Sequence, residues 1–232
     1  MSSRVDGSAV ALGRLIVTSI DVPARTLNTF AALISAEEQQ RAARFRFEKH
    51  RRRYVAARAN LRLVLSAELG VAAQDVHFDY GPQGKPLLAG ELGKIGVSFN
   101  LSHSGDLALI GVCRGGEVGV DLEIQRPLAD ADQLAQRYFS TQELAAYLAA
   151  PAAQRTAEFF NCWTRKEALL KARGQGLAAI ASLSGDMLPD WSCWNFDAAP
   201  GFAAAVAVHR RNCDLKAEAP ASSRVRLGPD SA

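Results

Sequence analysis

The sequence predicts an α+β fold, because strand patterns and helix patterns occur in both halves of the chain. Three short apolar segments separated by glycines and polar turns indicate strands, and their order suggests an antiparallel meander. They cover residues 96–104, 107–113 and 118–124. Two longer segments carry apolar residues at helical spacing and stop at Gly70 and Gly174, which are plausible helix C-caps.

The first half begins with a lead-in, residues 1–13, that we expect to be flexible, and a strand over 14–22. A helix over 35–45 follows, with Ser35 as its N-cap and a glutamate three residues later. Next come the helix that ends at Gly70, over 50–70, and a short strand with a loop stiffened by prolines and a glycine, over 76–88.

After Pro127 helical patterns dominate, over residues 130–149 and 153–174, and 201–209 is an apolar strand candidate. The final segment, 214–232, is polar and rich in Ala, Ser and Pro, so we expect it to be disordered. These features divide the chain into an N-terminal half, 14–115, a C-terminal half, 116–213, and a disordered tail.

Composition narrows the possible functions. The net charge of +3 is too small to argue for nucleic acid as a partner, but arginines are concentrated between Arg41 and Arg62. That cluster suggests an anionic ligand or an acidic partner, and a solvated basic helix face is the alternative. The four cysteines show no metal-ligand spacing, and no signal segment or membrane-spanning run is visible. We therefore expect a cytoplasmic protein that binds neither nucleic acid nor membrane.

The segment 118–124 places two acids inside an apolar strand. Successive side chains of a strand point to opposite faces, so Asp121 and Glu123 share one face. Two like charges on one face repel each other and are costly to desolvate. A positive group is therefore expected beside them.

A third acid, Glu167, stands in the helical segment 153–174, with Lys166 beside it and Lys171 one turn further along the same face. A surface ion pair between Glu167 and Lys171 is one explanation. Combined with the two strand acids, Glu167 completes a set of three carboxylates, which suits Mg²⁺ held together with substrate phosphates. Neighbouring lysines would then neutralise phosphate oxygens that the metal leaves free.

Other segments supply groups suited to phosphate. His103 lies between the hydroxyls of Ser102 and Ser104 and could donate to a diphosphate oxygen. Lys85 stands on a stiff, glycine-containing loop, which is not a P-loop because no Ser or Thr follows the lysine and no helix opens there. Guanidinium groups able to grip phosphate bidentately are present at Arg51, Arg52 and Arg58.

Four motifs taken in order, GKPLL, FNLSHSG, GVDLE and WTRKEALLKARGQGL, resemble the surfactin-type 4′-phosphopantetheinyl transferase family. The family hallmark is (V/I)G(V/I)D-x-E followed by W-x-x-K-E-x-x-x-K, and this chain departs from it at none of these positions. The resemblance implies a monomer of two similar α/β halves related by a pseudo-twofold axis, with the active site in the cleft between them.

The resemblance also implies roles for individual residues. Asp121, Glu123 and Glu167 would bind Mg²⁺, with Mn²⁺ as a possible substitute. Contacts to coenzyme A would come from His103 and Lys171 at the pyrophosphate, Lys85 and Pro86 at the adenine, and Arg58 with Arg51 at the 3′-phosphate. Ser102 and Lys166 are further expected contacts to coenzyme A.

The expected reaction transfers the 4′-phosphopantetheine arm of coenzyme A to a serine of an apo acyl or peptidyl carrier protein. Glu167, directly or through a water, would take the serine proton, and Lys171 would stabilise the leaving phosphate. Two alternatives use the same residues differently. One is a Mg²⁺-dependent nucleotide pyrophosphate hydrolase, and the other is a catalytically silent carrier-binding module.

Overall fold

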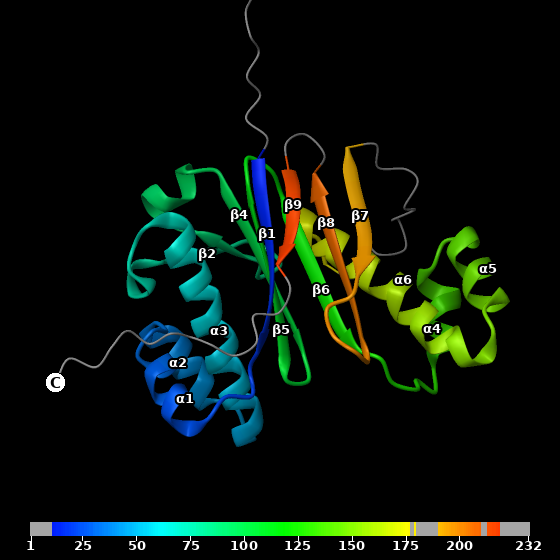
Figure 1. Cartoon of the computed structure of the whole chain (residues 1–232), viewed down its shortest axis with the longest axis horizontal. Coiled ribbons are helices and arrows are strands. Elements are labelled where there is room, and N and C mark those ends of the chain that lie inside the picture. Colours follow the sequence, from blue (N-terminus) through cyan, green and yellow to red (C-terminus); the bar gives the residue numbers. More distant parts are fainter. Residues whose placement is uncertain (1–10, 177–178, 180–189, 210–212, 219–232) are drawn as a thin grey trace, which may run out of the picture.

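The computed structural model describes residues 11–176, 179, 190–209 and 213–218. Within these residues the strands stand at the centre of the molecule, with α1–α3 on one side and α4–α6 on the other (Figure 1). The helices are α1 (Ala24–Ala31), α2 (Ala36–Ala43), α3 (Glu48–Leu69), α4 (Ala131–Tyr138), α5 (Thr141–Ala149) and α6 (Ala152–Arg173). The strands are β1 (Ala11–Ser19), β2 (Phe78–Tyr80), β3 (Pro86–Leu88), β4 (Val97–Ser104), β5 (Leu107–Arg114), β6 (Val118–Ile124), β7 (Trp191–Phe196), β8 (Phe202–His209) and β9 (Cys213–Glu218).

The N-terminal half contains a sheet with the order β4-β5-β1-β9. Strands β4 and β5 form a hairpin, β1 pairs antiparallel with β5, and β9 pairs in parallel with β1. One face of this sheet packs on α3, where Leu61, Leu65, Phe99 and Ile110 share a buried cluster. The paired β2 and β3 form a separate two-stranded sheet.

The C-terminal half contains the antiparallel sheet β6-β8-β7, whose two faces are both buried. Because side chains alternate along a strand, Val120 and Val206 point to the first sheet, where they meet Leu15 and Leu109. Ala205 is among the residues that point the other way and pack against α6. The described residues thus form four layers, α3, sheet, sheet and α6.

The two halves are similar. Each contains a 22-residue helix that ends at a glycine in the left-handed conformation, Gly70 after α3 and Gly174 after α6. Each half also contains a short helix that begins with a capping box. In this box the side chain of the N-cap serine accepts a hydrogen bond from the backbone N–H of a glutamate three residues later, and the side chain of that glutamate accepts one from the backbone N–H of the serine. The predicted cap at Ser35 is therefore confirmed, and Ser140 is its counterpart in the second half.

The predicted meander is right for β4 and β5 and wrong for β6. Strand β6 pairs with β8, which comes much later in the chain, and not with β5. The sequence signal for a strand is local and does not identify its partner. The strand expected over 14–22 runs from Ala11 to Ser19, so residues 11–13 of the expected flexible lead-in belong to a strand, and residues 1–10 lie outside the described part.

Two further expectations are corrected. The single helix expected over 130–149 is two helices, α4 and α5, because the capping box at Ser140 starts a new one. Residues 214–218 of the expected disordered tail belong to β9, and the remainder of that tail lies outside the described residues. Strands β3 and β7 were not predicted.

Two of the cysteines, Cys162 and Cys193, are free thiols, and Cys113 is disulfide-bonded. Of the helices that the structure describes, none combines the length and apolar character needed to cross a membrane.

Candidate active site at the seam between the halves

The acids of β6 lie beneath α6. Asp121 and Glu123 point to the α6 side of their sheet, and Lys171 of α6 reaches Asp121. The close approach of helix and strand depends on Gly119, because a Cβ there would lie 2.1 Å from the carbonyl oxygen of Ala168. The glycine of the GVD motif thus lets the backbone of α6 rest on β6.

Asp121 is almost fully buried, and one of its carboxylate oxygens accepts two hydrogen bonds. Lys171 Nζ donates to Oδ1 at 2.5 Å, and Ser102 Oγ donates to the same oxygen at 2.9 Å. The other oxygen, Oδ2, is buried and has no hydrogen-bond partner among the described residues. Lys171 thus supplies one positive group beside the strand acids, and one carboxylate oxygen remains unsatisfied.

Glu123 and Glu167 are half-buried carboxyls with raised pKa values. Burial raises the pKa of Glu123 most, and the charge of Asp121 raises it further, although a hydrogen bond from Ser104 Oγ at 2.9 Å opposes this. Burial also raises the pKa of Glu167, as do the charges of Asp121 and Glu123, against the opposing effect of Lys171. The three acids therefore lie close enough to repel one another.

Whether these residues fit a metal ion can be judged from the donor set. In the part of the chain that the structure describes, no three His, Cys, Asp or Glu side chains are already arranged as a metal cage. Three mutually repelling carboxyls and the unsatisfied Oδ2 of Asp121 nevertheless match what a hard divalent cation requires. The donor set therefore fits Mg²⁺, provided that Lys171 and the two glutamates adjust their side chains.

His103 and Ser102 lie on opposite faces of β4, because they are adjacent on a strand. Ser102 is buried against Asp121 and Lys171, so its hydroxyl is committed to the carboxylate cluster. The His103 side chain is exposed on the other face, and partial desolvation lowers its pKa, as do the positive charges of Lys171, Arg53 and His50. The charges of α6 and of α3 therefore both act on His103.

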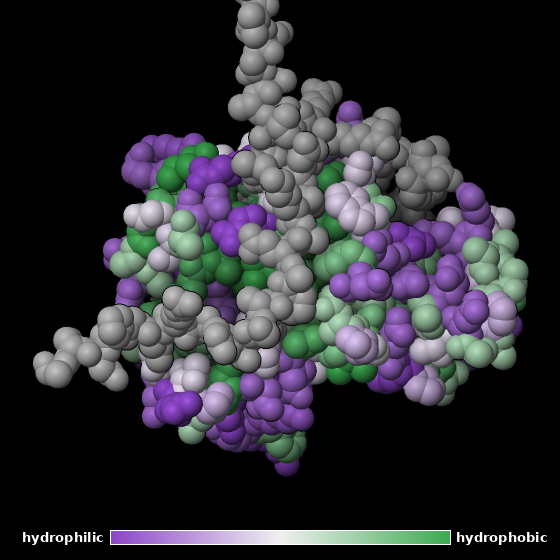
Figure 2. All heavy atoms as spheres, in the orientation of Figure 1, coloured by the Kyte–Doolittle hydropathy of each residue, from purple (hydrophilic) through white to green (hydrophobic). Residues whose placement is uncertain are grey.

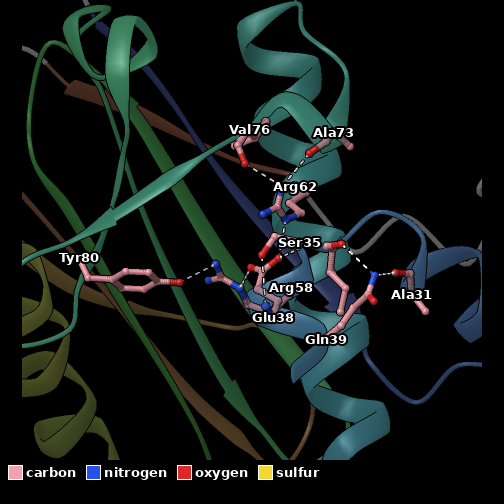
Figure 3. A network of polar contacts seen from close by, with 10 residues as sticks. Ala31, Ser35, Glu38, Gln39, Arg58, Arg62, Ala73, Val76 and Tyr80 are labelled. Atoms are coloured by element: carbon pink, nitrogen blue, oxygen red, sulfur yellow. Dashed lines mark hydrogen bonds and ion pairs between the residues drawn. The ribbon is translucent and has the colours of Figure 1, made fainter. Parts of the chain in front are cut away.

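Arg58, expected to grip a 3′-phosphate, instead belongs to a buried network. Its Nε donates to Glu38 Oε1, and its Nη2 lies 3.5 Å from the hydroxyl of Tyr80 (Figure 3). Its guanidinium lies over the ring of Phe78. Arg62 donates to the other oxygen of Glu38 and to the carbonyl oxygens of Ala73 and Val76. Arg58 thus lies in the core that joins α2, α3 and β2.

Lys166, an expected contact to coenzyme A, has an ion-pair partner in another helix of its half. It is buried, and its Nζ lies 2.8 Å from Glu143 Oε2 of the second capping box. Its neighbour Glu167 lies with the carboxylates, so the helix directs the two residues to different surroundings. The structure therefore places Lys166 with α5 and not beside Asp121.

The remaining predicted residues lie at the edges of the site. Arg51 is exposed and pairs with Glu48 on the same helix. Lys85 bridges the halves, since its Nζ donates to Glu117 Oε2 at 3.2 Å and to the carbonyl oxygen of Ala172 at 2.9 Å. Lys85 and Pro86 also line a pocket of about 460 Å³ between β3 and β4.

Two arginines that sequence reasoning did not single out line a larger pocket, of about 580 Å³, between α2 and α3. Arg41 and Arg44 lie there with Tyr54 and Tyr80, and the remaining lining residues are Glu37, Glu38 and Gln40. The arginine concentration visible in the sequence was the signal, and Figure 2 shows hydrophilic side chains gathered over the N-terminal end of α3, where that segment lies. An anionic ligand with a planar ring would match these groups.

Comparison with known proteins gives matches in both halves of the chain. Residues 117–214 match the 4′-phosphopantetheinyl transferase superfamily model, and residues 23–114 match the model of the N-terminal region of such a transferase. The 4′-phosphopantetheinyl transferase HetI of Nostoc sp. is 42% identical over 170 residues, which cover 73% of this chain and 72% of HetI. The 4′-phosphopantetheinyl transferase psf-1 of Bacillus pumilus is 33% identical over 62% of this chain and 60% of its own length. AcpT of Escherichia coli, also named a 4′-phosphopantetheinyl transferase, is 43% identical over 45% of this chain and 52% of its own length.

Both halves of the chain match models of one enzyme family, and the match to HetI extends across both. The seam carries the acids and the lysine of the two hallmark motifs, which the fold brings into contact from β6 and α6. The chain belongs to the 4′-phosphopantetheinyl transferase family.

Proposed function

We propose that this protein transfers the 4′-phosphopantetheine arm of coenzyme A to a serine of an apo acyl or peptidyl carrier protein, which yields holo-carrier and 3′,5′-ADP. The observation that carries the proposal is the cluster of Asp121, Glu123, Glu167 and Lys171 at the seam, within a chain related to HetI along most of its length. The hydrolase alternative finds no support among the relatives, whose names are those of transferases.

Asp121, Glu123 and Glu167 are the residues that would hold Mg²⁺. The unsatisfied Oδ2 of Asp121 and the raised pKa values of both glutamates support this assignment. A bound cation would give Oδ2 a partner, and its positive charge would lower the pKa values of the glutamates. When bound, Mg²⁺ would neutralise the charge of the coenzyme A diphosphate. Mn²⁺ offers a similar charge and also accepts oxygen ligands, so it is a suitable substitute.

The protein's own residues account for the proton and the leaving group. The oxygen of the carrier serine forms a bond to the phosphorus next to pantetheine, and the bond from that phosphorus to the oxygen of 3′,5′-ADP breaks. Glu167 is the best base for the serine proton, since its raised pKa brings it closer to working pH. Lys171, now paired with Asp121, would turn its ammonium to the leaving phosphate.

The nucleotide end of coenzyme A fits the pocket between α2 and α3. Arg41 and Arg44 supply cations for the 3′-phosphate, and Tyr54 and Tyr80 supply rings beside which adenine could pack. The positive charges that lower the pKa of His103 come from both α3 and Lys171. We propose that they attract the diphosphate of coenzyme A, which would then lie between this pocket and the carboxylates. The adenine wall predicted at Lys85 and Pro86 stays a prediction, and those residues line the smaller pocket.

The nucleophile in this reaction belongs to the carrier, so the chain needs no catalytic serine of its own. A basic balance, with a net charge of +3, favours encounter with an acidic carrier. We further propose that the protein acts as a monomer in the cytoplasm, as its sequence predicts.

The test is mass spectrometry of a panel of apo carriers incubated with the protein, coenzyme A and Mg²⁺. The expected result is a mass gain equal to one phosphopantetheine group on at least one carrier, with loss of the gain when the carrier serine is replaced by alanine. Release of 3′,5′-ADP at the same rate without any carrier would instead identify a hydrolase. Absence of both products with every carrier would contradict the proposal.

A further inference from the structure

The two sheets meet along strands β4 and β6, which are edge strands of their own sheets. An edge strand leaves every second backbone N–H without a strand partner, and a buried N–H requires an acceptor. On β6 the N–H groups that point away from β8 are those of Val120, Leu122 and Ile124. Residues 120 and 122 are fully buried, so their acceptors cannot be bulk water.

Side chains of β4 supply those acceptors. Asn100 Oδ1 accepts from Val120 at 2.9 Å, Ser102 Oγ from Leu122 at 3.3 Å, and Ser104 Oγ from Ile124 at 3.1 Å. At the start of the same strand, Ser98 Oγ donates to the carbonyl oxygen of Gly116 at 2.6 Å. We call these four β4 side chains, Ser98, Asn100, Ser102 and Ser104, the side-chain ladder.

The ladder joins the halves in one register. Its residues alternate along β4, so all four project to the same face, and their partners advance along β6 at the same rate. A slip of one residue would bring Phe99, Leu101 and His103 against the β6 backbone, and the N–H groups would lose their acceptors. The register between the halves is therefore determined by polar side chains and not by a backbone ladder.

Two members of the ladder also contact the active-site acids. A hydroxyl group can accept and donate at once, and both serines do so. Ser102 accepts from Leu122 N–H and donates to Asp121, and Ser104 accepts from Ile124 N–H and donates to Glu123 at 2.9 Å. Each serine thus ties a carboxylate to the backbone of the residue that follows it.

We propose that Ser102 and Ser104 are positioning residues, whose hydroxyls make the directions of Asp121 and Glu123, and hence the metal-binding geometry, depend on the register between the halves. This inference rests on the proposed function only for the identity of the bound cation. Partners that orient metal ligands in this way commonly contribute about 10- to 100-fold to metal affinity.

Ser104 allows the sharper test, because Ser98 provides a matched control. Both are ladder serines, but the Ser98 side chain bonds only to a backbone carbonyl among the described residues, whereas Ser104 also bonds to Glu123. The probe is Mn²⁺ alone, titrated by calorimetry into the chelator-treated full chain without coenzyme A or carrier. We expect Ser104→Ala to weaken Mn²⁺ binding by about 10- to 100-fold, and Ser98→Ala to leave it unchanged.

A conservative replacement of Ser104 distinguishes loss of the hydroxyl that orients Glu123 from general destabilisation of the fold. Ser104→Thr keeps the hydroxyl and suits a strand, so it should restore most of the Mn²⁺ affinity. Equal Mn²⁺ affinity for wild type and Ser104→Ala would overturn the proposal. An equal loss for Ser98→Ala and Ser104→Ala would do the same, since it would indicate a purely structural ladder.

A second measurement does not depend on metal or activity. Urea unfolding of Ser104→Ala, Glu123→Ala and the double variant forms a double-mutant cycle. Non-additive effects are expected if Ser104 holds Glu123, and additive effects would contradict the orienting bond. If the wild-type chain bound no Mn²⁺, the metal assignment in the proposed function would fail, and the cycle would still decide whether Ser104 orients Glu123.

Discussion

Arg62 and Lys166 occupy equivalent positions in the two halves of the molecule. Each stands at the same interval before the glycine that ends its long helix, and each is buried. Arg62 bonds to Glu38 and Lys166 to Glu143, and both glutamates belong to capping boxes. In both halves an ion pair therefore fastens the short helix to the long one.

The first prediction concerns pH and Glu38. Burial raises the pKa of Glu38, but the charge of Arg58, the backbone N–H of Ser35 and the charge of Arg62 outweigh it and lower the pKa below its usual value. The ionised glutamate therefore stabilises the fold above its unfolded pKa, and this stability is lost as pH falls through the folded pKa. At neutral pH Glu38→Gln should lower the free energy of unfolding by about 3–5 kcal/mol, because two buried guanidinium groups lose their counter-charge.

Urea unfolding of both proteins at several pH values measures this effect. The difference between wild type and Glu38→Gln should shrink as the medium is acidified below about pH 4. Glu37→Gln, which changes the exposed neighbour on the same helix, serves as the control and should have little effect. A difference that does not vary with pH would contradict the assigned role.

The second prediction concerns the ion pair between Lys166 and Glu143. Lys166→Met keeps the length of the side chain but leaves Glu143 without its cation, so stability should fall by about 1–3 kcal/mol. The KM for coenzyme A should not change, because the residue lies against α5. Thermal unfolding measures the stability, and steady-state kinetics on the same preparation measures the KM for coenzyme A. A large rise in KM without loss of stability would restore Lys166 as a contact to coenzyme A.

The third prediction concerns the contact between β6 and α6. Gly119→Ala would place a methyl group 2.1 Å from a backbone oxygen of Ala168 and 2.3 Å from the nitrogen of Ala172, so α6 must move. We expect a destabilisation of about 1–3 kcal/mol or more, together with loss of transfer, because Glu167 and Lys171 move with the helix. Gly81→Ala is the control, since its nearest neighbour would lie at an ordinary 3.7 Å. Wild-type stability for Gly119→Ala would show that α6 is not held this closely.

The fourth prediction separates stability from catalysis at Glu167. Burial, followed by the charges of Asp121 and Glu123, raises its pKa, so the folded state binds the proton more tightly than the unfolded state does. Above the folded pKa the ionised carboxylate therefore costs stability. Without metal and near neutral pH, Glu167→Gln should raise the melting temperature while transfer falls by about 10²- to 10⁴-fold.

Lowering the pH should remove that gain in melting temperature, because wild-type Glu167 then becomes protonated. Glu158→Gln, on the same helix, is the control for a change of net charge. Transfer at the wild-type rate by Glu167→Gln would exclude this residue as the base.

The fifth prediction concerns the pocket between α2 and α3. Replacing both Arg41 and Arg44 by alanine should raise the KM for coenzyme A by about tenfold or more, because charge-assisted contacts to the 3′-phosphate are lost. Dephospho-coenzyme A, which lacks that phosphate, should be affected much less. Arg46→Ala removes a nearby arginine that lies over Phe47 and not in the pocket, so it is the control. An equal rise in KM for coenzyme A and dephospho-coenzyme A would show that the 3′-phosphate does not bind in this pocket.

Local periodicity is sufficient to predict which faces of β6 and α6 carry the acids and the lysine. Alternation along β6 puts Asp121 and Glu123 on one face, and helical spacing puts Glu167 one turn from Lys171. The pairing of β6 with β8, the separation of α4 from α5 and the strand β9 were missed. Strand partners come from tertiary packing, which a local pattern does not contain.

The arginines show what a local pattern leaves open. Nothing in the spacing of Arg41, Arg44, Arg58 and Arg62 tells which side chains face a pocket and which face Glu38. The difference depends on α2 folding back against α3, a contact between distant segments. A signal for the ladder was present, since small polar residues alternate from Ser98 to Ser104, but its meaning depends on β6 lying alongside.

Strand β9 has a consequence for synthesis of the protein. It pairs in parallel with β1, the first strand described, so the outer edge of β1 stays open until residues 213–218 have left the ribosome. Unpaired edges invite association with other chains, and late pairing of distant segments slows folding. We expect the nascent chain to depend on chaperones until translation reaches β9, and the first half produced alone to aggregate.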